Sequence, residues 1–172
     1  MLTGYSGTLA PYIKDALDKR GHEVILWDHK VIRVDDTFAM REFFLQNKPD
    51  VFFHLATGPE SWLESIINLS KPLNIPLLFT STESVFDETQ EGPFTIDTPA
   101  LAKGDCGQYK IRCEKIINEK YPDNSYIVRI GWQIGMEALK NNMLYYLVAQ
   151  GKVEASTNGF YLHHLCRIRQ PL

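Results

Sequence analysis

The stretch Met1-Leu2-Thr3-Gly4-Tyr5-Ser6-Gly7-Thr8-Leu9-Ala10 decides how the chain folds. Three residues with strand character precede a turn that contains two glycines, and a helical pattern begins directly after it. Gly4 permits the tight turn, Gly7 permits a close backbone approach, and Ala10 is small enough for a helix to pack on the strand. This spacing is typical of a loop that holds a dinucleotide pyrophosphate at a helix N-terminus, and an ordinary glycine turn is the alternative.

Apolar segments with strand character alternate with segments of helical periodicity along most of the chain. The predicted strands cover residues 1–3, 23–28, 51–56, 76–81 and 125–130. The predicted helices cover residues 8–19, 35–47, 59–69, 107–120 and 141–150. Strands that are apolar on both faces and alternate with helices predict a Rossmann-like, doubly wound parallel α/β sheet.

Composition limits the classes of protein and partner. The chain has 172 residues, 44% of them apolar, and a formal net charge of −3 without a clustered basic stripe. We therefore expect no nucleic-acid partner. No apolar run is long enough to span a membrane, and no secretory signal pattern is present. The three cysteines (Cys106, Cys113 and Cys166) lack metal-ligand spacing, so we expect a reduced, cytoplasmic protein without a metal site.

Asp28 ends the second predicted strand and lies 21 residues after Gly7. In dinucleotide-binding folds an acidic residue at about this distance from the glycines binds the ribose hydroxyls. A carboxylate there favours NAD over NADP, because it repels a 2′-phosphate. An exposed turn aspartate is the alternative interpretation of Asp28.

Five motifs in a fixed order resemble those of a known family. They are Gly-x-x-Gly-x-x-Ala (4–10), Asp-Val-Phe-Phe-His-Leu-Ala (50–56), Ser-Thr-Glu-Ser-Val-Phe-Asp (81–87), Lys110 with Glu114, and Arg-Ile-Gly-Trp-Gln-Ile-Gly (129–135). Together they resemble the extended short-chain dehydrogenase/reductases, and most of all the dTDP-4-dehydrorhamnose reductase branch. The resemblance covers residues 1 to about 150.

The resemblance implies a reaction and a set of site residues. In that branch NADPH or NADH delivers hydride to a 4-keto-sugar nucleotide, a Tyr protonates the alkoxide, and a Lys four residues later binds the nicotinamide ribose. By this resemblance, Thr82 corresponds to the hydroxyl that binds the carbonyl, Lys110 to the lysine, and Cys106 to the tyrosine position. The expected cofactor-binding residues are Gly4, Ser6, Gly7, Asp28, Leu55, Ala56, Thr57 and Lys110, and the expected substrate-facing residues are Ser84 and Trp132. For Trp132, a core position is the alternative.

Two departures from the family pattern count against ordinary reductase turnover. A cysteine side chain at position 106 is too short to reach the oxygen that a tyrosine would protonate, and Ser84 stands where the family has a substrate-facing Tyr.

Tyr109 is expected to point about 100° away from Lys110 around the helix. Cys106 is either redox-sensitive or a replacement without function. Glu114 and Lys115 are expected on a solvated helix face.

These observations predict residues 1–150 as an NAD(P)-binding domain and residues 151–172 as an irregular tail, the remnant of a substrate lobe that is largely missing. A truncated or frame-shifted gene product is the corresponding hypothesis. The apolar surface left by a missing lobe favours self-association, for example as a homodimer. Three interpretations stay open: a sugar-nucleotide reductase, a non-catalytic nucleotide-sensing or regulatory subunit of the same fold, and a folded fragment without a function.

Overall fold

The structure is a computed structural model of the chain, and it describes residues 1–87, 89–131, 133, 143–150 and 166–167. The helices of this part are α1 (Ala10–Asp18), α2 (Thr37–Asn47), α3 (Glu60–Ser70), α4 (Asp105–Lys120) and α5 (Met143–Gln150), with short 3₁₀ turns at Lys71–Leu73 and Glu83–Val85. The strands are β1 (Leu2–Thr3), β2 (Phe52–His54), β3 (Leu77–Thr82), β4 (Ser125–Ile130) and β5 (Cys166–Arg167).

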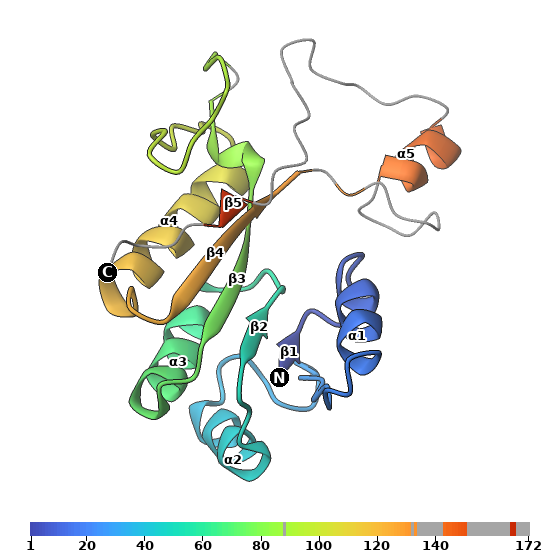
Figure 1. Cartoon of the computed structure of the whole chain (residues 1–172), viewed down its shortest axis with the longest axis vertical. Helices are drawn as coiled ribbons and strands as arrows, with labels where there is room; N and C mark the ends of the chain where they lie inside the picture. The colour runs from blue at the N-terminus through green and yellow to red at the C-terminus, as the bar shows by residue number, and fades with distance from the viewer. Residues whose placement is uncertain (88, 132, 134–142, 151–165, 168–172) are drawn as a thin grey trace.

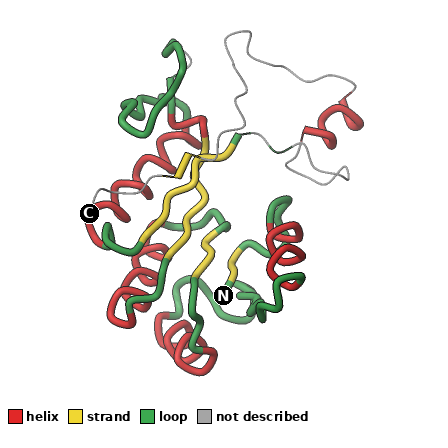
Figure 2. Tube along the Cα trace, viewed as in Figure 1, coloured by secondary structure: helices red, strands yellow, loops and turns green. Residues whose placement is uncertain are grey.

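The strands form one sheet in the order β1-β2-β3-β4-β5 (Figure 2). β1 to β4 are parallel, and β5, which lies in the predicted tail, pairs with β4 in the antiparallel direction. Figure 1 shows α2, α3 and α4 on one side of the strands and α1 on the other. This arrangement confirms the predicted Rossmann-like α/β sheet, in which the carboxyl ends of the parallel strands share one edge.

The strand predicted over residues 23–28 is wrong in its extent. Only Leu26 pairs with the sheet, through a single parallel bridge to Leu2. The Leu2 amide donates to the Ile25 carbonyl at 2.8 Å, and the Trp27 amide donates to the Leu2 carbonyl at 2.9 Å. The ladder stops there because β1 has two residues and Gly4 then turns the backbone away from the strand direction.

The main hydrophobic core lies between the sheet and helices α2, α3 and α4. Large side chains with at most 3% exposure fill it, and they include Trp27, Phe44, Phe52, Trp62, Ile66, Leu77, Phe79 and Ile117. The Trp27 ring meets Phe52 and Trp62 edge-on, with centroids 5.9 and 6.2 Å away. Burial of such side chains contributes about 1.5–3 kcal/mol each, so this cluster holds the sheet on which the candidate site is built.

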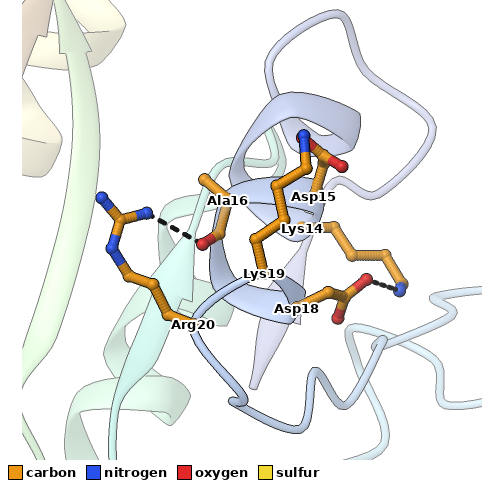
Figure 3. Close-up of polar contacts among 6 residues, drawn as sticks. All are labelled: Lys14, Asp15, Ala16, Asp18, Lys19 and Arg20. Carbon is orange, nitrogen blue, oxygen red and sulfur yellow. Dashed lines mark hydrogen bonds and ion pairs between the residues drawn. The ribbon is translucent and has the colours of Figure 1, made fainter.

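Helix α1 is held less deeply than the helices on the other face. Ala10 is its only fully buried residue, as expected of the small residue that packs on the strand. Its outer surface carries the ion pair between Lys14 and Asp18 and a hydrogen bond from Arg20 to the Ala16 carbonyl (Figure 3). Exposed pairs of this kind contribute only about 0.3–0.5 kcal/mol each. Helix α1 therefore depends for its position on the glycine turn, on Ala10 and on half-buried side chains such as Ile13 and Leu17.

The starts of α2 and α4 and the predicted tail complete the description of the fold. The Asp36 side chain caps α2 by accepting from the Ala39 amide at 2.9 Å. Helix α4 begins two residues earlier than predicted, at Asp105. Most of the predicted tail, together with Trp132, lies outside the described residues. Within the described part, no helix is long and apolar enough to cross a membrane.

Candidate functional site

The glycine turn after β1 touches the end of β2. Gly4 has a φ of +71°, in the left-handed region that favours glycine. A Cβ on Gly4 would lie 2.8 Å from the Ala56 backbone nitrogen and 3.0 Å from the Leu55 carbonyl carbon. Gly4 is therefore required both by its backbone angle and by its close approach to β2. This contact brings together three of the predicted cofactor-binding residues.

The loop from Gly4 to α1 has the features that a pyrophosphate needs. The Gly7 amide donates to the Gly4 carbonyl at 2.9 Å, and Ser6 and Gly7 are exposed. No side chain caps the first turn of α1, and the buried Thr8 hydroxyl has no hydrogen-bond partner among the described residues. Backbone amides at a helix N-terminus, with an adjacent hydroxyl, fit a phosphate anion. The residues present thus fit the dinucleotide that the glycine spacing predicts.

Asp28 lies beside this loop. The Lys30 amide donates to its Oδ1 at 2.8 Å, and this hydrogen bond lowers the pKa of the Asp28 carboxyl. The Tyr5 side chain, from the glycine turn, faces the same carboxylate, which raises the pKa of the Tyr5 phenol. An ionised carboxylate therefore borders the glycine turn.

Lys110 lies on α4, and its side chain is buried against β3. It is 8% exposed, and its Nζ donates to the Thr80 carbonyl at 2.7 Å. The ammonium also lies 4.5 Å from the centre of the Phe79 ring. Burial lowers the pKa of Lys110. The strand, rather than solvent, thus fixes the ammonium beside the carboxyl end of β3.

Gly107 permits this close packing, and it was not among the site residues predicted from the sequence. A Cβ on Gly107 would lie 2.2 Å from the Ser84 carbonyl oxygen and 2.5 Å from the Ala102 Cβ. Only glycine therefore lets the first turn of α4 approach the end of β3. The one sequence signal was a glycine three residues before Lys110 in a predicted helix, where glycine costs about 1 kcal/mol relative to alanine.

Thr82 and Ser84 stand where β3 ends. The Thr82 hydroxyl accepts from the Ser84 amide at 3.1 Å, which leaves its proton available for an acceptor such as a carbonyl oxygen. Thr82 is half-buried and Ser84 is exposed. Thr57, another predicted cofactor residue, is exposed in the loop after β2. These residues therefore border the same strand edge as Gly4 and Lys110.

Cys106 is exposed in the first turn of α4, one helical turn before Lys110. The nearby Tyr109 does not replace a tyrosine at position 106. Its hydroxyl accepts from the Gly58 amide at 3.2 Å, and burial raises its pKa to about 12. The Lys110 Nζ lies 5.5 Å from the Tyr109 ring centre.

The expectation that Glu114 lies on a solvated helix face is wrong. Glu114 is 6% exposed and accepts a hydrogen bond from the Ser81 hydroxyl. Arg129, on β4, donates to its two oxygens from Nε and Nη2 at 3.1 and 2.7 Å. Ser81 and Arg129 are register partners, so one carboxylate of α4 connects β3 with β4. Lys110 and Glu114 thus anchor α4 to Thr80 and Ser81, the two residues before Thr82.

Comparison with known proteins places these features in a family. Residues 62–157, more than half of the chain, match the model of the family described as RmlD substrate binding domain. The dTDP-4-dehydrorhamnose reductase of Streptomyces griseus is 27% identical over an alignment 151 residues long, which covers 78% of this chain and 50% of that protein. The chain thus spans about half the length of this curated relative.

Solved structures share the fold. A dTDP-4-dehydrorhamnose reductase from Clostridium acetobutylicum superposes with a TM-score of 0.74 at 22% identity, over 87% of this chain and 58% of that one. The Bacillus anthracis protein of the same name, solved in complex with NADP, gives 0.73 at 17% identity over the same shares. These likenesses concern the fold alone. The match over residues 62–157 shows that the chain belongs to the RmlD substrate binding domain family.

Proposed function

We propose that this chain binds a nicotinamide dinucleotide at the carboxyl edge of its sheet, as the cofactor domain of a sugar-nucleotide reductase. The observation that carries the proposal is the glycine turn, in which Gly4 lies so close to Ala56 that no side chain fits between them. The Bacillus anthracis structure with NADP, which shares the fold, supports it.

Each described residue has a separate task in the proposed complex. The amides that follow Gly7 would hold the pyrophosphate, and Asp28 would accept from the ribose hydroxyls. Lys110 would bind the second ribose, beside the nicotinamide. The cofactor would supply the hydride. The Thr82 hydroxyl would donate a hydrogen bond to a carbonyl oxygen that lies at the end of β3.

Asp28 makes NADH the preferred form in this proposal. The Lys30 amide stabilises the ionised carboxylate, and an ionised carboxylate repels a 2′-phosphate. Asp28→Asn removes the charge and keeps the shape, so the variant should bind NADH and NADPH with similar affinities. Wild-type protein that binds NADPH more tightly than NADH would contradict this preference.

A second candidate function is a nucleotide-sensing or regulatory subunit without turnover. The observation that favours it is the absence, among the described residues around Lys110, of a phenol that could protonate an alkoxide. Cys106 occupies that position, and the Tyr109 hydroxyl lies at Gly58 instead. The two candidates share cofactor binding and differ in catalysis, so separate experiments test them.

Calorimetric titration of the 172-residue chain with NADH and with NADPH tests the binding. We expect saturable binding in the micromolar range, lost in Gly4→Val because valine collides with Ala56. A folded wild-type protein that binds neither cofactor would refute the proposal.

Cys106→Tyr then tests the chemistry. If this variant reduces a 4-keto-sugar nucleotide with NADH while the wild type does not, the site is complete apart from its acid. If the variant binds NADH and stays inactive, the sensing function is favoured.

A further inference from the structure

A buried polar pair joins β1 to β2 directly beneath the glycine turn. Thr3 and His54 are register partners in the parallel ladder, with exposures of 0% and 1%. The Thr3 Oγ1 and the His54 Nδ1 lie 2.9 Å apart. Thr3 is the residue before Gly4, and His54 is the residue before Leu55. The pair therefore stands at the base of the candidate cofactor loop.

The hydrogen bonds of Thr3 decide the role of His54. The Leu55 and Ala56 amides both donate to the Thr3 Oγ1, at 3.2 and 3.4 Å. A hydroxyl has two lone pairs and one proton. Since the two amides use the lone pairs, the Thr3 proton goes to the His54 Nδ1, which must be unprotonated. His54 is then the neutral tautomer with its proton on Nε2.

The surroundings of His54 keep it neutral. Burial, with a smaller effect from the nearby Lys110 charge, lowers the pKa of His54 to about 3. The ring stacks on Phe79 with centroids 5.8 Å apart and meets Trp62 edge-on at 4.9 Å. The imidazole is therefore a fixed hydrogen-bond acceptor at neutral pH.

From this geometry we infer that His54 is a positioning residue for the cofactor loop and acts through Thr3. By accepting a hydrogen bond from the Thr3 hydroxyl, it turns the hydroxyl oxygen toward the Leu55 and Ala56 amides. Those amides set the surface against which Gly4 packs, and a Cβ on Gly4 would be 2.8 Å from the Ala56 nitrogen. The inference rests on the proposed cofactor binding.

Packing alone makes a different prediction. If His54 only filled space between Phe79 and Trp62, any apolar side chain of similar size would serve. If its Nδ1 matters, a substitute must offer an acceptor toward Thr3. Without one, the Thr3 hydroxyl has to turn its proton elsewhere, and one amide then loses its acceptor.

Two matched pairs of variants separate these roles. His54→Asn and His54→Leu remove the same ring and have similar sizes, but only asparagine can place an acceptor oxygen near the Nδ1 position. Thr3→Ser and Thr3→Val form the second pair, which keeps or removes the hydroxyl. We expect His54→Leu and Thr3→Val to bind NADH about tenfold more weakly than their polar counterparts, the loss expected for one hydrogen bond.

A nuclear magnetic resonance readout tests the same inference without the cofactor. The ¹⁵N shifts of the wild-type His54 ring should report a protonated Nε2 and an unprotonated Nδ1. The Leu55 and Ala56 amide protons should shift and exchange faster in His54→Leu and Thr3→Val than in His54→Asn and Thr3→Ser. Thermal denaturation checks that the compared variants are folded. If either His54 variant does not fold, the comparison of Thr3→Ser with Thr3→Val tests the inference.

The outcomes distinguish the two proposals. Equal NADH affinities and equal Leu55 and Ala56 amide signals within each pair would overturn the positioning role and leave cofactor binding intact. If folded wild-type protein binds no cofactor, the proposed function fails. The amide signals of the loop then decide whether His54 positions it, and unchanged signals in Thr3→Val would overturn that inference as well.

Discussion

Removing the Glu114 carboxylate should destabilise the fold more than the substitution of an exposed residue does. Glu114→Ala leaves Arg129 in a site where its side chain is 10% exposed, and the Arg129 Nη1 already has no partner among the described residues. At 2.7 Å and an effective dielectric constant of about 20, the attraction between the two charges is about 6 kcal/mol before desolvation. Removing one member of a buried pair costs about 3–5 kcal/mol. We expect a loss in this range.

Urea unfolding, followed by circular dichroism, measures this loss. The matched control is the double variant Glu114→Met with Arg129→Met, which removes both charges and keeps much of the side-chain volume. Replacement of a buried ion pair by apolar residues is often neutral or stabilising, so the double variant should recover most of the lost stability. A loss below about 1 kcal/mol in Glu114→Ala would refute the reasoning, because the pair would then behave like an exposed one.

Three further changes test the packing. Gly107→Ala should cost at least about 2 kcal/mol in the free energy of unfolding, measured with urea, because its methyl group meets the Ser84 carbonyl; unchanged stability would contradict the close contact. Phe44→Ala, at a residue with 0% exposure, should lower the same free energy by about 3–5 kcal/mol. Lys14→Ala breaks only the exposed pair with Asp18, and its midpoint of thermal unfolding should shift by no more than about 3 °C.

Sequence-based prediction works best for the elements that a run of neighbouring residues identifies. The strand over 125–130 coincides with β4, because a run of β-favouring residues between polar turns needs no distant partner for its identification. The glycine turn is equally local, and its contact with Ala56 follows from the Rossmann-like fold. The segment 23–28 has the same apolar pattern, but β1 is too short to pair with it beyond Leu26.

Site positions that belong to a sequence motif could be predicted. Contacts between residues far apart in the sequence could not. Lys110 was found from its motif, but its hydrogen bond to Thr80 depends on the approach of α4 to β3. The burial of Glu114 depends on Arg129, 15 residues later on another element. Nothing in the local sequence around a glutamate on a helix indicates such a counter-charge. The Thr3 bond to His54 likewise spans 51 residues and follows only from the strand register.

In the proposed complex, cofactor binding and turnover would depend on different contacts. The Lys110 ammonium is held by the Thr80 carbonyl and by burial against Phe79, and neither contact involves position 106. A residue other than tyrosine at position 106 therefore leaves both contacts of the lysine unchanged. Cys106 itself is exposed, so its replacement by tyrosine requires no rearrangement of the core. A cofactor affinity that is the same in Cys106→Tyr and wild type would follow, even if only the variant gains activity. A large change in that affinity would instead mean that position 106 helps to hold the cofactor.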